Sequence, residues 1–345
     1  MVNMQGLGAG PQLAPQHMAL IPPEKLVDIE QQYAKDLTAL MMNPTGGEIR
    51  DRRFAGEAWK SPWNQATVNF YLLNSKHLLT LADAVEADAK TRQRIRFTTE
   101  QMIDAMSPAN FFATNPEAMQ RIIDTKGESL RTGILNALAD LGKGKVSQTD
   151  DTAFEVGKNM ATTEGAVVYQ NELFQLIQYK PLTAKVYERP YLMIPPCINK
   201  FYILDLQPEN SLIRYAVSQG HRTFVVSWRN PDESLRNTTW DDFIEQVAIK
   251  AISVTQEISG SKQINALGFC VGGTILSNAL AVLAARGQKP VSSATFLTTL
   301  IDFTDTGVLD VFIDEAFVKF REGQFADGGL MKGKDMASTF SFLRP

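Results

Sequence analysis

The spacing of hydrophobic residues along this chain changes near residue 150. Before that point apolar residues recur every three or four positions, which places them on one face of an α-helix. The first such stripe consists of Leu26, Ile29, Tyr33, Leu37 and Leu40. After it, short apolar runs bounded by turn residues alternate with stretches of helical spacing. The pattern therefore predicts an all-helical part followed by a part built on a β-sheet.

The first part is expected to contain several helices. Helical spacing continues over 63–88, 91–106 and 127–141. Asn115 followed by Pro116 predicts a further helix start, because asparagine caps free N–H groups and proline fits the first turn. We expect the first stripe, 26–40, to pack in a core. The polar, glycine-bearing stretch 142–151 predicts a linker after the helices.

The second part begins with two runs, 166–169 and 173–179, that predict paired antiparallel strands. Further strands are expected at 191–194, 223–228, 264–269 and 294–300, and helices at 211–219, 240–258, 271–285 and 308–322. This alternation predicts an α/β fold with a mostly parallel sheet. Because open α/β sheets bind ligands at the carboxyl ends of their strands, the loops 196–200 and 229–231 should lie at the functional edge with Cys270 and Asp302.

Three segments follow from these patterns. Residues 1–20 are rich in Gly, Pro, Gln and Met without any period, and we expect a mobile tail. Residues 21–150 are expected to form a helical N-terminal domain. Residues 151–345 are expected to form an α/β domain that is incomplete at its C-terminal end.

Composition excludes several classes of function. The formal charge is −4 and the basic residues are dispersed, so we expect no nucleic-acid partner. Cys197 and Cys270 cannot build a disulfide framework, and a thiol nucleophile requires a reducing compartment, which predicts a cytoplasmic protein. No basic residue precedes Lys25, and no uncharged apolar run approaches the roughly 18 residues that span a membrane, so neither a signal peptide nor a transmembrane segment is predicted. We expect no cofactor and no metal.

The chemistry is predicted at Gly268-Phe-Cys-Val-Gly272, where a buried strand meets a helix. In the α/β-hydrolase elbow the central residue is the nucleophile, and the two glycines give its side chain room. The positive end of the helix favours a thiolate on Cys270, and the Val271 amide is free to bind an oxyanion. The alternative is that Cys270 is a small buried hydrophobe and the glycines are coincidental.

A base for this nucleophile is missing from the pattern. The chain contains three histidines, His17, His77 and His221. His17 lies in the tail, His77 in a helix, and His221 at the amino end of a strand, far from the functional edge. Elbow folds place an acid and then a histidine after the nucleophile, so we expect the base beyond residue 345. Asp302 could serve as the acid, but a structural role in a turn is favoured.

Several motifs resemble those of one family. They are Pro195-Pro-Cys-Ile-Asn-Lys200, Val226-Ser-Trp-Arg-Asn-Pro231, Gly268-Phe-Cys-Val-Gly-Gly-Thr274, Asp51-Arg-Arg-Phe-Ala-Gly56 and Ala105-Met-Ser-Pro-Ala-Asn110. Together they resemble class I polyhydroxyalkanoate synthases of the poly(3-hydroxybutyrate) polymerase type. The resemblance covers nearly everything after the tail, and it implies the front part of such an enzyme, with a truncated α/β-hydrolase core.

The resemblance also implies roles for particular residues. Cys270 would be the acylated nucleophile, and the backbone amides of Val271 and Ile198 would form the oxyanion hole. Cys197 and Asn199 match neighbours in the same loop, to which no role is assigned. The family's triad aspartate and histidine match nothing in this chain, so we expect the chain to be inactive alone.

By the same resemblance the substrate would be an (R)-3-hydroxyacyl-CoA, with 3-hydroxybutyryl-CoA expected, and the second substrate would be a growing polyester chain. The protein would release CoA and act as a homodimer on the surface of cytoplasmic polyester granules, with granule-associated proteins as partners. Two alternatives stay open. One is a thiol-dependent α/β hydrolase, and the other is a non-catalytic fragment that binds granules or partners through its helices.

Overall fold

The computed structural model describes residues 21–144, 146–147, 149–198, 200–326, 328–331 and 333–343. The predicted tail, 1–20, lies outside these ranges. The described residues form two compact units. One unit is drawn from Met1–Gln148, Gly307–Arg321 and Met331–Pro345, and the other from Thr149–Thr306 and Glu322–Leu330. Compactness alone does not define a folding domain, so the boundary near residue 150 stays a prediction.

The first unit is helical, as the spacing of its apolar residues predicts. Its main helices are α1 (Pro23–Met42), α2 (Pro62–Asp83), α3 (Ala89–Ala105), α4 (Pro116–Asp124), α5 (Glu128–Lys143) and α11 (Gly333–Leu343). Asn115 caps α4 by accepting from the N–H groups of Glu117 and Ala118, which confirms that prediction. Helix α2 ends five residues before the predicted limit, because Asp88 instead caps α3 by accepting from the Thr91 N–H.

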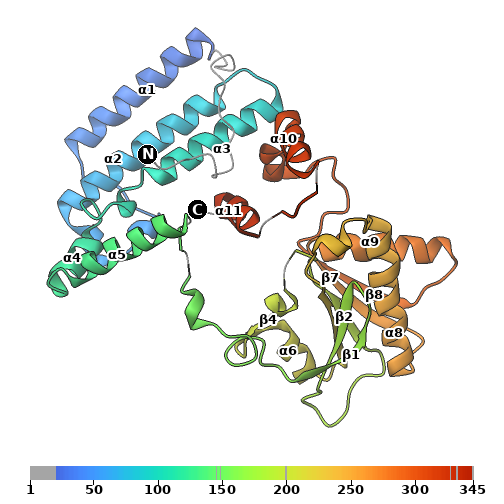
Figure 1. Ribbon diagram of the computed structural model, residues 1–345. Coiled ribbons are helices and arrows are strands. Elements are labelled where there is room, and N and C mark those ends of the chain that lie inside the picture. The colour runs from blue at the N-terminus through green and yellow to red at the C-terminus, as the bar shows by residue number, and fades with distance from the viewer. Residues whose placement is uncertain are drawn as a thin grey trace. The chain divides into compact units, whose positions relative to one another are not determined.

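The core of this unit does not include α1, contrary to expectation. Helix α1 lies along α2 (Figure 1), and the Tyr33 ring stacks on His77 with centroids 4.2 Å apart. None of its residues is buried, however, because α2 covers only one of its sides. The buried cluster nearby instead contains Phe54, Trp59 and Val68. Phe54 and Trp59 meet edge to face at 4.9 Å.

A segment distant in sequence completes this unit. The single helix predicted over 308–322 is in fact a 3₁₀-helix, η10 (Gly307–Phe312), followed by α10 (Glu315–Phe325). Phe312 packs edge to face on Phe97 of α3 at 5.3 Å. Lys90 forms an ion pair with Asp310 at 3.1 Å. Apolar spacing could not predict the break, since a 3₁₀ turn and an α-helix bury similar positions.

The second unit contains a six-stranded sheet in the order β1-β2-β6-β3-β7-β8. Its strands are β1 (Gly165–Gln170), β2 (Phe174–Tyr179), β3 (Tyr191–Ile194), β6 (Thr223–Trp228), β7 (Ile264–Phe269) and β8 (Val291–Leu297). Strands β6, β3, β7 and β8 are parallel, and β1 and β2 are antiparallel additions, as predicted. Strand β8 ends three residues early, because Thr298 has a φ of 44° that breaks the extended backbone. A separate short pair, β4 (Asp205–Gln207) and β5 (Asn210–Ser211), was not predicted.

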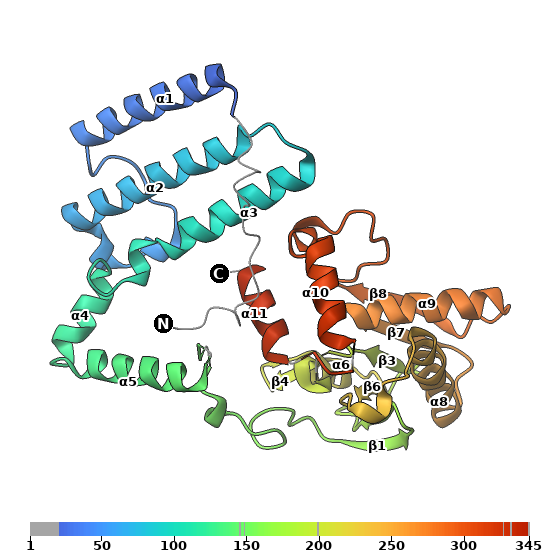
Figure 2. The ribbon, with the colours of Figure 1, turned by 45° about the horizontal axis from the view of Figure 1, so that its top comes forward.

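Helices cover both faces of this sheet. Alternate residues of a strand point to opposite faces, and in β3 Leu192 and Ile194 pack with α8 (Lys250–Ser259) and α9 (Val271–Ala285). Met193 between them packs with α6 (Leu212–Ser218) on the other face. Figures 1 and 2 show α8 and α9 beside the sheet. Strand β3 is therefore apolar on both sides, which explains its uninterrupted apolar sequence.

The predicted helix 240–258 is present but irregular. It begins as α7 (Trp240–Asp242), continues as a π-helix, η9 (Phe243–Ile249), and ends as α8. The Asn171 side-chain amide donates to the Gln246 carbonyl in the π-helical stretch at 2.8 Å. Sequence spacing predicted the helix but not this change of hydrogen bonding, which shifts the side chains that follow.

Candidate active site

Cys270 lies at the turn between β7 and α9. Its backbone has a φ of 53° and a ψ of −128°, a conformation that residues with a side chain rarely adopt. The Cys270 N–H donates to the Leu297 carbonyl at 2.9 Å, and its own carbonyl accepts from the Gly273 N–H at 2.8 Å. Strand β8 and the first turn of α9 therefore hold the strained residue from both sides.

The glycines around this turn permit backbone contacts that no side chain would allow. A Cβ atom on Gly268 would lie 2.3 Å from the Gly273 Cα, and a Cβ atom on Gly272 would lie 2.3 Å from the Ile194 carbonyl oxygen. A Cβ atom on Gly273 would lie 2.1 Å from the Thr299 Oγ1. The end of β7, the first turn of α9 and the end of β3 thus contact one another through their backbones. Gly273 was missed by the sequence reasoning, although it belongs to the quoted motif.

Val271 is the first residue of α9. The first N–H groups of a helix have no acceptor within it, so the Val271 N–H can bind an oxygen atom that comes from outside. The positive end of the helix macrodipole lies at the same point. Thr274 anchors this first turn, because its hydroxyl donates to the Leu300 carbonyl at 2.7 Å. The elbow therefore has the layout that an oxyanion site requires.

The loop after β3 approaches the same turn. Its Pro195 carbonyl would lie 2.5 Å from a Cβ atom on Gly272, and it accepts from the Trp228 indole N–H at 2.7 Å. Burial raises the pKa of the Cys197 thiol, and the charge of Cys270 adds to the shift in the same direction.

The loop after β3 continues with Ile198 and Asn199. Ile198 is exposed. Asn199 lies outside the described residues. Lys200 forms a hydrogen bond with the Asn230 side chain, which ties the loop after β3 to the loop after β6. The loops after β3 and β6 are therefore in direct contact at one edge of the sheet, as expected.

The structure places no described histidine next to Cys270. His221 precedes β6, whose Thr223 pairs with Tyr191 at the start of β3, whereas Gly268 pairs with Ile194 at the end of β3. His221 therefore lies at the opposite edge of the sheet. Its ring lies near the ring of Tyr191, with centroids 5.5 Å apart.

The other two histidines offer no base either. His77 belongs to the helical unit, where it stacks on Tyr33 and lies 3.5 Å from a Glu30 oxygen. His17 lies outside the described residues. Within the described part of the chain, Cys270 thus has no imidazole in its own unit besides His221.

Asp302 is a turn residue in this structure. Its carboxylate accepts from the Thr304 N–H at 2.9 Å and from the Thr304 hydroxyl at 2.8 Å. These two hydrogen bonds hold the pKa of the carboxyl below its ordinary value. The side chain is exposed. Its observed contacts are those of a local turn, in line with the structural role that the sequence favours.

The described residues contain no group of three or more His, Cys, Asp and Glu side chains that could hold a metal ion. Across the same ranges, no helix combines the length and the apolar character needed to cross a membrane.

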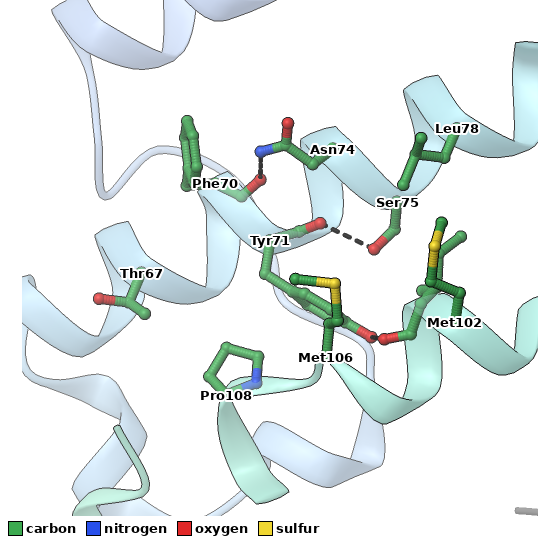
Figure 3. A pocket seen from close by; sticks show the side chains of 10 residues that line it. Thr67, Phe70, Tyr71, Asn74, Ser75, Leu78, Met102, Met106 and Pro108 are labelled. Carbon is green, nitrogen blue, oxygen red and sulfur yellow. Dashed lines mark hydrogen bonds between the residues drawn. The ribbon is translucent and has the colours of Figure 1, made fainter. Parts of the chain in front are cut away.

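The helical unit contains an apolar pocket of about 290 Å³ between α2 and α3 (Figure 3). It is lined by Thr67, Phe70, Tyr71, Asn74, Ser75, Leu78, Met102, Ile103, Met106 and Pro108. No carboxylate, amine, imidazole or thiol lines it.

A strained residue on a turn between a parallel strand and a helix is typical of the elbow of an α/β-hydrolase fold, and Cys270 occupies such a turn here. A family model described as "alpha/beta hydrolase fold" matches residues 190–339. A second model, described as "Poly-beta-hydroxybutyrate polymerase (PhaC) N-terminus", matches residues 50–216. The chain belongs to the polyhydroxyalkanoate synthase family, as the motifs predicted.

Known proteins that resemble this chain agree with this family assignment. The chain is 60% identical to "Poly(3-hydroxyalkanoate) polymerase subunit PhaC" of Cupriavidus necator, over 94% of this chain and 57% of the relative. It is 42% identical to "Poly(3-hydroxyalkanoate) polymerase" of Methylorubrum extorquens, over 86% of this chain and 50% of the relative. The chain thus spans about half the length of these relatives. The structure of a putative lipase from Sulfolobus solfataricus aligns at 14% identity with a TM-score of 0.32, over 39% of this chain and 43% of that chain.

Proposed function

We propose that Cys270 carries the acyl group in a polymerase that joins 3-hydroxyacyl units from CoA thioesters into a polyester. One observation supports this most strongly. Cys270 has the left-handed backbone and the flanking glycine contacts of a nucleophile elbow. The relatives named poly(3-hydroxyalkanoate) polymerase supply the reaction class.

In the first step the Cys270 thiolate attacks the thioester carbonyl carbon of the (R)-3-hydroxyacyl-CoA. The new carbon–sulfur bond to Cys270 forms, the bond to the CoA sulfur breaks, and CoA leaves as a thiolate that takes up a proton. The negative charge on the carbonyl oxygen would be stabilised by the amides of Val271 and Ile198. One thioester replaces another, so the acyl group stays activated.

In the second step the hydroxyl at the end of a growing chain attacks the acyl-Cys270 carbonyl. The hydroxyl loses its proton, an oxygen ester forms, and Cys270 leaves as a thiolate. A base must deprotonate first the thiol and then the hydroxyl. His221 lies at the wrong edge of the sheet, so we expect negligible turnover by residues 1–345 alone. The base and its acid partner would come from sequence outside this chain.

The place of action belongs to the same proposal. The family resemblance points to a homodimer at the surface of cytoplasmic polyester granules, with granule-associated proteins as partners. No cofactor is required by the two steps, because each is an acyl transfer between a sulfur and a sulfur or an oxygen.

A second candidate is a non-catalytic binding role for this chain. Helix α5 supports it, because none of its described residues is buried. Ile134, Leu138 and Leu141 are more than half exposed, at 54%, 58% and 61%. An apolar helix face of this kind can bind a granule or a partner protein.

The test is to incubate the chain, and a full-length synthase that contains it, with radiolabelled 3-hydroxybutyryl-CoA. From the full-length enzyme we expect label on the peptide that contains Cys270, together with insoluble polymer. Cys270→Ala should lose the label, and a Cys197→Ala variant should keep it. Release of free hydroxy acid without polymer would identify a thiol hydrolase instead. Robust CoA release by residues 1–345 would contradict the expected inactivity.

A further inference from the structure

Trp228 connects two loops at the edge of the sheet where Cys270 lies. It is the last residue of β6, and its indole N–H donates to the Pro195 carbonyl, 2.7 Å away in the loop after β3. Strands β6 and β3 are parallel neighbours, so both chain segments emerge at the same edge. The hydrogen bond is partly buried. It therefore restrains the loop more than an exposed contact would.

The Pro195 carbonyl is restrained on a second side as well. A Cβ atom on Gly272 would lie 2.5 Å from its oxygen, so the carbonyl rests against the backbone at the start of α9. The next residue, Pro196, has its φ locked by its ring, as does Pro195 itself. Few free torsions thus separate the fixed carbonyl from Ile198. Any rotation of the Pro195 carbonyl must move the Cys197 and Ile198 peptides.

The Trp228 ring is itself held in place. Phe243 packs against it edge to face, with centroids 5.5 Å apart and an interplanar angle of 72°. Phe243 is the first residue of the π-helix. Such helices are rare and occur frequently near functional sites. The π-helix thus holds the Phe243 ring, which packs on the Trp228 ring, and Trp228 in turn holds the loop after β3 through its hydrogen bond.

We propose that Trp228 is a positioning residue for the oxyanion-binding loop, acting through its indole hydrogen bond to the Pro195 carbonyl. This inference rests on the proposed function, in which the Ile198 amide stabilises the oxyanion. Trp228 touches none of the reacting atoms. Without the Trp228 indole N–H, the buried Pro195 carbonyl would have no hydrogen-bond donor. The loop would then shift until this carbonyl finds another donor. The Ile198 amide would then be misplaced at the moment when charge develops.

The test compares two reactions of the Cys270 thiolate at one alkaline pH. The first is acylation by 4-nitrophenyl 3-hydroxybutyrate, in which sulfur attacks the ester carbon, an oxyanion forms, and 4-nitrophenolate leaves with its electron pair. The second is alkylation by iodoacetamide, in which sulfur displaces iodide and no oxyanion forms. Neither needs the missing base, because the pH supplies the thiolate. Mass spectrometry of the Cys270 peptide gives both rates.

The variant is Trp228→Phe, which keeps an aromatic ring but removes the indole donor. We expect its acylation to slow about tenfold, less than the 10²- to 10³-fold typical for removal of an oxyanion donor itself. Alkylation should stay within about twofold of the original rate. Trp240→Phe is the matched control, because that ring also lies near Phe243, at 6.5 Å. It should leave both rates unchanged.

Each other result overturns the inference. Equal slowing of both reactions would mean that Trp228 only supports the fold, and unchanged acylation would mean that its hydrogen bond positions nothing. If Trp228→Phe does not fold, 3-benzothienylalanine at position 228 keeps the shape of the ring without the N–H and allows the same comparison. Alkylation of Cys270 without acylation in the unaltered chain would refute the proposed function, and this inference with it.

Discussion

Gly268 and Gly273 touch backbone to backbone across the turn that carries Cys270. A Cβ atom on Gly268 would lie 2.3 Å from the Gly273 Cα and 2.9 Å from its nitrogen. Both distances are far below normal van der Waals contact, and neither backbone atom can move away as a flexible side chain could. The close approach lets the first turn of α9 lie directly against the end of β7.

Gly268→Ala should therefore destabilise the sheet unit by about 2–4 kcal/mol, because the added methyl group forces strand and helix apart. Denaturant unfolding followed by circular dichroism measures the change. Gly133→Ala is the control, since Gly133 lies in α5 with no atom within 4 Å of the added position. It should be neutral or stabilising by up to about 1 kcal/mol. Equal destabilisation by both changes would contradict the backbone contact.

Cys270 should store strain that its removal relieves. At a φ of 53° the side chain crowds the backbone, at a cost of about 1–2 kcal/mol that glycine does not incur. Cys270→Gly and Cys270→Ala both remove the thiol, but we expect the glycine variant to be more stable than the alanine variant by about 1 kcal/mol. Thermal unfolding of the two proteins tests this. Higher stability of the alanine variant would argue against a left-handed turn.

Asp205 should be a structural carboxylate. It is 1% exposed and accepts from the Thr163 N–H, the Thr163 hydroxyl and the Ser211 hydroxyl. Asp205→Ala leaves these donors unpaired and should cost about 3 kcal/mol of unfolding free energy. Asp205→Asn, which keeps one acceptor oxygen, should cost less. Glu209→Ala is the control at an exposed site and should stay within about 0.5 kcal/mol.

The Cys197 thiol should resist ionisation. Burial raises its pKa above the ordinary value of 9.0, since the thiolate would lose solvation. Folding therefore favours the protonated thiol, and this contribution to stability is complete below pH 9 and is lost as the pH rises through the folded pKa. In a Cys270→Ala variant, alkylation of Cys197 should have a higher pH midpoint in the folded than in the denatured protein. Coincident midpoints would contradict the burial effect.

The contact between Phe97 and Phe312 should attach η10 to α3. Their rings meet at 5.3 Å with an interplanar angle of 79°, which is the favourable edge-to-face arrangement. A double-mutant cycle with Phe97→Ala and Phe312→Ala should give a coupling energy of about 0.5–1.5 kcal/mol. Limited proteolysis should cut residues 307–321 faster in either variant. Additive effects and unchanged proteolysis would mean that the two rings do not stabilise each other.

Local patterns predicted most of the secondary structure. Strands β3 and β6 were expected at their observed limits, because a short apolar run bounded by turn residues is specific for a buried strand. The start of α4 was predicted from Asn115 and Pro116 for a similar reason, since capping depends on neighbouring residues alone. The errors lie where tertiary contacts override local spacing. The π-helix at Phe243 and the 3₁₀ turn before Phe312 are examples.

The sequence by itself determined the order of the elements and the position of Cys270 between a strand and a helix, because periodicity and glycine spacing are properties of adjacent residues. Only the tertiary structure decided that the Trp228 indole reaches the Pro195 carbonyl and that the Lys200 side chain reaches the Asn230 side chain. Both facts depend on which strands become neighbours and in which register. That choice is made by the packing of the whole sheet between its helices, and no local stretch of the chain contains it.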